Sequence, residues 1–454
     1  MPTLRAPSDS GKLPPKVRLP ALTQTAWFLK SPHGFLEYNA QRLGPVFRAR
    51  ILGFGSGDFA FVSDPALIER VFTHRGSNLL AGRAAYTTIE PVGGANSLLV
   101  LDPPRHLEER KLMLPAFHGD RMRSYRDVIA EETRRSIASW PSGVSFSLRP
   151  RFAEIALDVI MRAVFGLSRG PNYSDLREAL LSVVENDRMI SLALMLPAIR
   201  RDVGPWRSWS NFRRQIRAAD HLIFREIEER WNDSDLSSRD DILSMLLLAR
   251  RDDGSALTME ELRDELVTML LAGHETTATA LAWTFDQLFR NPHVLEELQA
   301  NVASDAPDPA LIDAVIYEAL RVRPVIPFVV RTLTEPWELA GFELPAGCTV
   351  APAIYAVHRD PRLYPDPGRF DPTRFLDRRP GTYEWLPFGG GTRRCIGASF
   401  ALFEMRTVLE TVLSETTLRA NSRRPERIQR RAFMLVPARG TPAVNYPLQT
   451  VARH

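Results

Sequence analysis

The chain has 454 residues, of which 44% are hydrophobic and 25% are charged, a composition typical of a globular protein. Its net charge of +4 is small, and no basic helix with interleaved aromatic residues stands out, so nothing in the sequence indicates nucleic-acid binding. No run of about 18 apolar residues occurs, so we expect no transmembrane helix. The two cysteines, Cys348 and Cys395, are too few for a disulfide framework and fit a reducing cytoplasm.

The N-terminal segment, residues 1–20, is polar and proline-rich, and we expect it to be flexible rather than a secretory signal. A short amphipathic helix is predicted from Pro32 to Arg42. Two strand-like runs follow, Val46 to Leu52 and Asp58 to Val62, and the glycine-rich junction between them predicts a hairpin. Asp64-Pro65 then begins a helix that ends near Thr73.

The next segment holds the first candidate site residues. Residues 76–99 are expected to be irregular. Asp102, followed by two prolines, begins a helix from Arg105 to about Leu114. His106 and Arg110 lie four residues apart on one face of this helix. Such a pair suits a carboxylate group, although a solvated helix face is the common alternative.

A mostly helical pattern extends over residues 125–166 and 174–231, with breaks near Pro197 and Gly204. The dense apolar residues between 180 and 196 favour a core role over a ligand-facing one.

The longest predicted helix begins with a capping box at Thr258 and ends at Arg290, before Asn-Pro. About 32 residues at 1.5 Å each give a rod of about 48 Å, which would cross the whole molecule. Its middle reads Ala272-Gly-His-Glu-Thr-Thr277, where Thr276 can bond a carbonyl one turn back and open the helix locally. Burying an acid beside a hydroxyl in an apolar helix costs free energy, which indicates that the pair has a function. The alternative is a polar patch that meets a neighbouring loop.

The last third alternates short elements with loops. A helix over 312–323 carries Glu318 and Arg321, three residues apart. Strands are predicted at 337–339 and 349–354, and the proline-rich residues 361–375 exclude regular structure. A helix from Ala398 to about Thr416 and a closing hairpin of 432–436 with 442–446 complete the chain.

A glycine-rich loop, Phe388-Gly-Gly-Gly-Thr-Arg-Arg-Cys395-Ile-Gly397, places a cysteine directly before a helix. Glycines let another group approach the sulfur, and the N-terminus of the helix favours its thiolate. Haem iron is the partner that suits such a sulfur best. A small buried cysteine, a phosphate-binding loop and a cysteine nucleophile are the alternatives from this loop alone.

Four motifs therefore occur in one order: Ala272-Gly-His-Glu-Thr-Thr277, Glu318-Ala-Leu-Arg321, Pro372-Thr-Arg-Phe375 and the Cys395 loop. Together they resemble the motifs of the cytochrome P450 family, and the resemblance spans about residues 20–450. It implies a mainly α-helical fold with a small β lobe, forming a single catalytic domain over residues 21–454. Haem b would lie between the long central helix and the Cys395 loop, as in the soluble bacterial members of the family.

The resemblance also implies roles for individual residues. Cys395 is expected to be the proximal ligand of the haem iron, next to Phe388 and Gly397. Glu275 and Thr276 match the acid–alcohol pair that delivers protons to bound oxygen. The other residues expected at the haem are Ala272 and Gly273, which leave room on the distal side, and the propionate-binding His106, Arg110, Arg331 and Arg393. Many relatives have Trp where His106 stands. Glu318, Arg321 and Arg374 resemble the family's structural triad.

The activity implied is insertion of one oxygen atom from O2 into a lipophilic molecule of fatty acid, terpenoid, steroid or macrolide type. The substrate would contact residues 76–99, 180–200, 325–330, 433–435 and the central helix. Because the chain ends soon after the Cys395 motif, we expect a separate ferredoxin or flavodoxin with its reductase. Such a partner could dock on the basic residues Lys111, Arg121, Arg123 and Arg394.

We expect a cytoplasmic monomer. The alternatives are a peroxygenase that uses H2O2, against which Glu275 and Thr276 argue, and a non-catalytic haem sensor.

Overall fold

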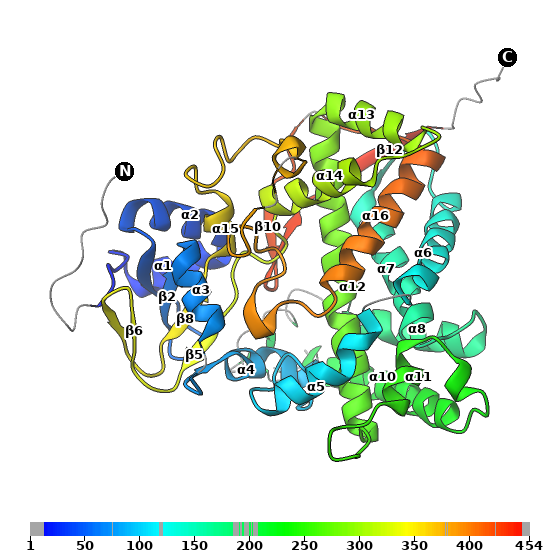
Figure 1. Cartoon of the computed structure of the whole chain (residues 1–454), viewed down its shortest axis with the longest axis horizontal. Coiled ribbons are helices and arrows are strands. Elements are labelled where there is room, and N and C mark those ends of the chain that lie inside the picture. The colour runs from blue at the N-terminus through cyan, green and yellow to red at the C-terminus, as the bar shows by residue number, and fades with distance from the viewer. Residues whose placement is uncertain are drawn as a thin grey trace.

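The computed structural model describes residues 13–74, 76–117, 121–184, 190, 193–194, 199–200, 202, 208–376, 378, 380–422 and 424–446. Over these residues the chain is mainly helical with small sheets, which confirms the predicted fold class (Figure 1). No helix of this described part is both long and apolar enough to cross a bilayer.

The helices follow one another closely along the chain. In order they are α1 Ala21–Lys30, α2 Pro32–Leu43, α3 Pro65–Thr73, α4 Ala81–Gly93, α5 Arg105–Met113, α6 Arg121–Ala138, α7 Leu148–Ala163, α8 Pro171–Val184, α10 Ser208–Trp231, α11 Ile242–Leu248, α12 Met259–Arg290, α13 Pro292–Val302, α14 Pro309–Val322, α15 Ile354–His358 and α16 Ala398–Glu415. Short 3-10 turns occur at η1 Leu114–Phe117, η3 Leu236–Ser238, η4 Pro372–Phe375 and η5 Gly391–Arg393.

The largest sheet has the strand order β1-β2-β8-β5-β3 and forms the β lobe with α1, α2 and α3 (Figure 1). Its strands are β1 Val46–Arg50, β2 Asp58–Val62, β3 Leu79–Leu80, β5 Arg331–Leu333 and β8 Thr349–Pro352. The predicted hairpin of β1 and β2 is confirmed, with Val46 opposite Val62. The smaller sheets comprise β6 Trp337–Leu339 with β7 Phe342–Leu344, β10 Ile428–Arg431 with β11 Met434–Pro437, and β4 Ser145–Ser147, β12 Pro442–Tyr446 and β9 Thr417–Ala420.

Helix α12 crosses the molecule, as predicted, and the other large helices pack around it (Figure 1). Its capping box is present: the Thr258 hydroxyl accepts from the Glu261 amide, and the Glu261 carboxylate accepts from the Thr258 amide. Helices α6, α7, α14 and α16 share one apolar core with the C-terminal half of α12. In this core Phe152 of α7 stacks on Phe285 of α12, with ring centroids 5.4 Å apart.

The expectation that residues 76–99 are irregular is wrong, because they contain β3 and α4. The local sequence does not indicate α4, because Leu80 at its N-cap position has no side-chain acceptor and Pro91 lies inside the helix. A distant residue caps the helix: the Asp102 carboxylate accepts from the amides of Gly82 and Arg83 at 2.7 and 2.8 Å.

The predicted closing hairpin is also wrong. Strand β11 pairs with the preceding strand β10, and β12 pairs with β4 and β9. The β10–β11 turn includes Ala432 at a φ of 50°, a conformation that is usually adopted by glycine. The sequence has no glycine there to indicate the turn.

Part of the N-terminal segment lies against the β lobe. Residues 1–12 are outside the described residues, whereas Lys16 forms a β-bridge with Arg48 and Val17 is buried.

Candidate functional site

The Cys395 loop joins the proline-rich segment to α16. The Cys395 amide donates to the Phe388 carbonyl at 2.9 Å, which closes the loop around the sulfur. Phe388 packs edge-on against Trp385, with centroids 5.9 Å apart. Cys395 is exposed, whereas Ala398, three residues later in α16, is buried. The thiol is therefore accessible to a ligand, as the sequence predicted.

Two glycines of this loop have the left-handed backbone that the motif predicts, Gly389 at a φ of 66° and Gly391 at 64°. A Cβ on Gly391 would lie 2.3 Å from the Phe72 carbonyl oxygen, so only glycine lets the loop pack on α3.

The electrostatics around Cys395 work in two directions. Although Cys395 has solvent-accessible surface, the protein packed around its sulfur desolvates the thiol and raises its pKa, while the Gly397 amide, Arg110 and Arg394 lower it. Without further stabilisation the thiol stays protonated at neutral pH. A bound metal cation would supply that stabilisation, because a coordinating thiol is deprotonated outright.

The four predicted propionate-binding residues come together from α5, β5 and η5. Burial and the charges of Arg393, Arg110 and Arg331 lower the pKa of His106 to about 3. Burial and the charge of Arg393 lower the pKa of Arg331 to about 10. Burial is the largest cause of both shifts, and the smaller contributions of the neighbouring arginines indicate that these side chains lie near one another.

Only one carboxylate among the described residues balances this cluster by an ion pair. Asp102 Oδ1 lies 3.0 Å from Arg393 Nη2, and the same carboxylate caps α4. Arg331 is buried and donates to its neighbour's carbonyl, while His106 Nδ1 has no hydrogen-bond partner in the described part of the chain. The cluster therefore has uncompensated positive charge and unused hydrogen-bond donors, both of which suit the two propionates of a haem.

The middle of α12 is the accessible part of an otherwise buried helix. Residues 262–270 and 277–288 are buried, whereas Ala272 is exposed and Gly273 and Thr276 are partly exposed. The Thr276 hydroxyl donates to the Ala272 carbonyl one turn back, as predicted. A Cβ on Gly273 would lie 3.4 Å from Ile160 Cδ1, an ordinary van der Waals contact, so packing on α7 does not require a glycine here.

Glu275 is held by two arginines that sequence reasoning missed. Its Oε2 lies 2.7 Å from Arg149 Nη1, and its Oε1 lies 3.6 Å from Arg431 Nη2. Arg149 belongs to α7 and Arg431 ends β10, so these partners are far apart in sequence. No local pattern around either arginine indicates the pairing.

A cavity of about 120 Å³ lies beside Glu275. It brings together α4, α8, α12 and the β10–β11 turn, which include the predicted substrate regions 76–99, 433–435 and the described part of 180–200. Residues 325–330 do not line it. Its described lining is Thr88, Ile89, Val92, Val183, Val184, Leu194, Leu270, Leu271, His274, Glu275, Arg431, Ala432, Phe433 and Met434.

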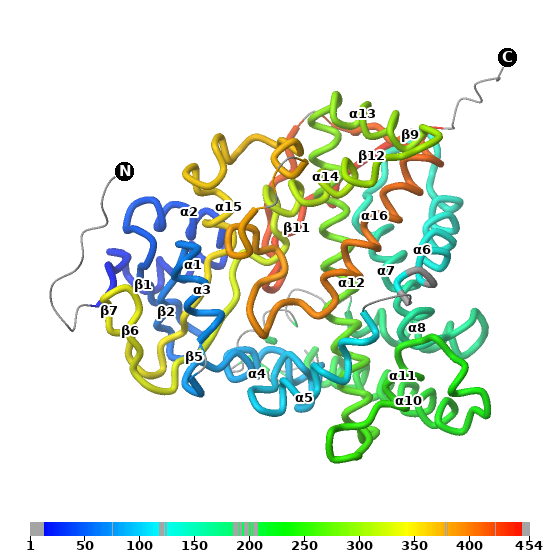
Figure 2. Tube along the Cα trace, in the orientation of Figure 1, coloured from blue at the N-terminus to red at the C-terminus, as the bar shows by residue number. Residues whose placement is uncertain are grey.

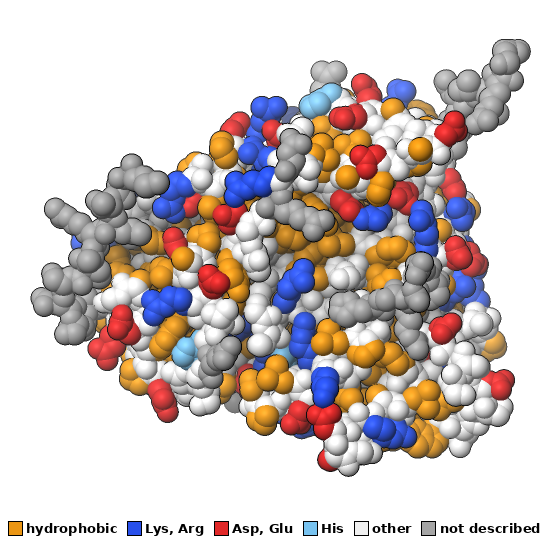
Figure 3. All heavy atoms as spheres, in the orientation of Figure 1, with side chains coloured by type: hydrophobic (Ala, Val, Ile, Leu, Met, Phe, Trp, Pro, Cys, Tyr) orange, Lys and Arg blue, Asp and Glu red, His pale blue; other side chains and the backbone are white. Residues whose placement is uncertain are grey.

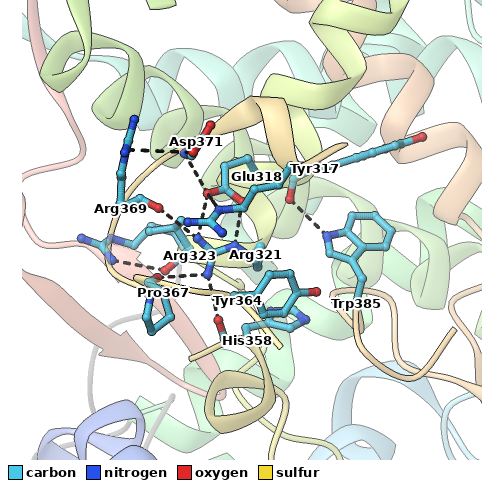
Figure 4. Close-up of polar contacts among 12 residues, drawn as sticks. Tyr317, Glu318, Arg321, Arg323, His358, Tyr364, Pro367, Arg369, Asp371 and Trp385 are labelled. Atoms are coloured by element: carbon cyan, nitrogen blue, oxygen red, sulfur yellow. Dashed lines mark hydrogen bonds and ion pairs between the residues drawn. The ribbon is translucent and has the colours of Figure 1, made fainter. Parts of the chain in front are cut away.

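The predicted triad forms a buried network between α14 and the proline-rich segment (Figure 4). Arg321 donates to the Glu318 carboxylate at 2.6 and 2.7 Å. It also donates to the carbonyls of His358, Pro367 and Arg369, at 2.8 to 3.1 Å. Arg374 Nε lies 3.6 Å from Glu318 Oε1. Figure 2 follows the proline-rich segment beside α14 on its way to α16. The network ties the proline-rich segment to α14.

Basic side chains form a short row over α5 and the loop before α16, in the middle of the face shown in Figure 3. Arg394 is exposed there. Lys111 is paired with Asp252 at 2.7 Å. The side chains of Arg121 and Arg123 lie outside the described residues.

Comparison with known proteins identifies the family. The family model described as Cytochrome P450 matches residues 13–443. Cytochrome P450 135B1 of Mycobacterium tuberculosis is 42% identical over 437 residues, covering 95% of this chain and 91% of the relative. Cytochrome P450 138 of the same organism is 37% identical over 433 residues, covering 94% and 95%.

Solved structures share the fold. The cytochrome P450DA heme domain superimposes with a TM-score of 0.84 at 23% identity, covering 97% of this chain and 98% of that one. Cyanobacterial CYP120A1, solved with bound retinoic acid, gives a TM-score of 0.81 at 24% identity, covering 97% and 100%. The chain therefore belongs to the cytochrome P450 family and is a monooxygenase that binds haem b.

Proposed function

We propose that the protein inserts one oxygen atom from O2 into a lipophilic small molecule of fatty acid, terpenoid, steroid or macrolide type. The observation that carries this proposal is the mainly apolar cavity that adjoins Glu275, the residue before Thr276. The bound haem would supply oxygen activation at an iron held by Cys395. A distant relative of the same fold holds retinoic acid, which is a lipophilic ligand.

Glu275 and Thr276 are proposed to move the protons. The Thr276 hydroxyl donates to a carbonyl, so its lone pairs remain free to accept a proton and its own proton can be passed on by rotation. Glu275 is positioned by Arg149 and is partly accessible, so its carboxylate can exchange protons with water. Arg331, Arg393, His106 and Arg110 are proposed to hold the propionates.

Electrons are proposed to come from a separate ferredoxin or flavodoxin. The row of basic side chains near Arg394 supports an acidic partner, because opposite charges steer encounter and fix orientation. Lys111 contributes less, since Asp252 already neutralises it.

The absorption spectrum of the reduced, carbon-monoxide-bound protein tests thiolate ligation, and turnover tests the reaction. We expect the long-wavelength Soret band and product formation with a surrogate ferredoxin pair under O2. Product with H2O2 alone, and none with the redox pair, would instead indicate a peroxygenase. A short-wavelength band in folded protein would contradict the proposal.

A further inference from the structure

The cavity beside α12 is mostly apolar, and its two charged lining residues, which form its polar end, lie 3.6 Å apart. Ile89, Val92, Val183, Leu270 and Leu271 are among its apolar lining residues. The polar end is formed by charged side chains from two elements: Glu275 of α12 and Arg431 at the end of β10. A ligand that fills the cavity must therefore present an apolar body and meet this polar end.

Two arginines lie beside the Glu275 carboxylate at the polar end, Arg149 and Arg431. His274 adds no charge at neutral pH, because burial lowers the pKa of its imidazole. Because Arg149 already pairs with Glu275 within hydrogen-bond distance, Arg431 is the cation at this end with which the anion of a ligand can pair.

Arg431 is the arginine whose donors remain available. Arg149 lies 2.7 Å from Glu275 Oε2, within hydrogen-bond distance, and its side chain is 16% exposed. Arg431 lies 3.6 Å from Oε1, beyond that distance, and its side chain is 31% exposed. In the described part of the chain the Arg431 side chain makes no hydrogen bond, so its planar fork can take a carboxylate through two parallel bonds.

We propose that the substrate is a lipophilic carboxylic acid whose carboxylate binds Arg431 while its hydrocarbon part lies against the apolar residues of the cavity. A carboxylate would compensate the charge of Arg431, whereas a dianionic phosphate would place a second negative charge beside Glu275. This inference rests on the proposed function, because it assigns a substrate class to the same cavity.

The experiment compares matched acids and alcohols on the haem-loaded protein. The pairs are dodecanoate with dodecan-1-ol, hexadecanoate with hexadecan-1-ol, and retinoate with retinol. Dissociation constants are measured by spectral titration and by calorimetry, which does not depend on a haem signal. The variants are Arg431→Gln, Arg431→Lys, and Arg427→Gln as a control, because Arg427 is exposed on the same hairpin and does not line the cavity.

In the wild type we expect at least one acid to bind more tightly than its alcohol. Arg431→Gln should weaken that acid by about ten- to a hundredfold, as for a charge-assisted hydrogen bond, and leave the alcohol unchanged. Arg431→Lys should restore part of the affinity, and Arg427→Gln should change neither ligand.

Two results would overturn the inference. One is a wild type in which no acid binds more tightly than its alcohol. The other is an Arg431→Gln variant that loses acid and alcohol equally, which is the behaviour of a structural residue. Either result would leave the proposed function standing if the carbon-monoxide spectrum and turnover of other lipophilic substrates are normal.

Discussion

The Arg321 guanidinium donates to both carboxylate oxygens of Glu318, at 2.6 and 2.7 Å, and both side chains are fully buried. Removing one partner of a buried pair leaves the other charge without compensation. We therefore expect Arg321→Ala to lower the free energy of unfolding by about 3–5 kcal/mol, measured by urea titration.

Arg406→Ala is the matched control for this change. Arg406 pairs with Asp313, also of α14, but both side chains are partly exposed. Loss of this ion pair should lower the free energy of unfolding by about 1 kcal/mol or less. Equal losses in the two variants would show that burial of the Arg321 pair does not determine its contribution.

The two cysteines give a direct test of the haem ligand. Cys395→Ser should abolish the long-wavelength band of the reduced carbon-monoxide complex, because an alcohol does not replace a thiolate ligand. Cys348→Ser should keep the band, since Cys348 is buried in the β lobe and burial raises the pKa of its thiol to about 12. Loss of the band in the Cys348 variant alone would reverse the assignment.

The local geometry of the candidate site could be predicted from the sequence because each of its features acts over a few residues. The capping box at Thr258, the turn glycines before Cys395 and the Thr276 hydrogen bond are all set by near neighbours. The sequence could not indicate α4, whose cap comes from Asp102, twenty residues on from Gly82. A cap at that distance depends on how the chain folds back.

The ion pairs of Glu275 with distant arginines could not be predicted from the sequence either. Arg149 precedes Glu275 by 126 positions, and Arg431 follows it by 156, so neither falls in a periodic pattern with it. The β10–β11 pairing that places Arg431 was predicted as a different hairpin. The acid of the candidate relay was therefore predictable, and its positioning residues were not.

Arg331 should have opposite effects on the apoprotein and on haem binding. It is a buried cation, and burial and Arg393 lower its pKa to about 10, so its charge is poorly compensated in the protein alone. Arg331→Leu should leave the apoprotein as stable as the wild type or more so, measured by urea unfolding. Haem should be lost faster to a scavenger such as apomyoglobin, because a propionate loses its partner. Destabilised apoprotein with unchanged haem loss would contradict the propionate role.

His358 predicts part of the pH dependence of stability. Its Nε2 accepts from the Leu386 amide at 2.8 Å, and burial together with Arg321 lowers its pKa to about 3. The unfolded imidazole, with a pKa of about 6.5, binds a proton first, so this group's contribution to stability is present above pH 6.5 and is lost as pH falls toward 3.

The measurement is urea unfolding of wild type and His358→Gln at pH 6 and pH 5. From pH 6 to pH 5 the free energy of unfolding should fall by about 1 kcal/mol more in the wild type than in the variant. The reason is that the variant has no imidazole at position 358 to take up a proton in the unfolded state. Equal pH slopes would show that His358 is not held neutral in the folded protein.

Thr276→Ala should separate oxygen consumption from product formation. Without the hydroxyl beside Ala272, proton delivery is impaired, so reduced oxygen should leave as H2O2. The ratio of product to reduced nicotinamide consumed should fall several-fold. Thr284→Ala is the matched control, because Thr284 also donates to a carbonyl one turn back, that of Ala280 at 2.9 Å, but lies in the buried part of α12. That variant should keep the wild-type ratio. If Thr276→Ala keeps it as well, the hydroxyl serves only the local shape of α12, and the relay must run through other groups.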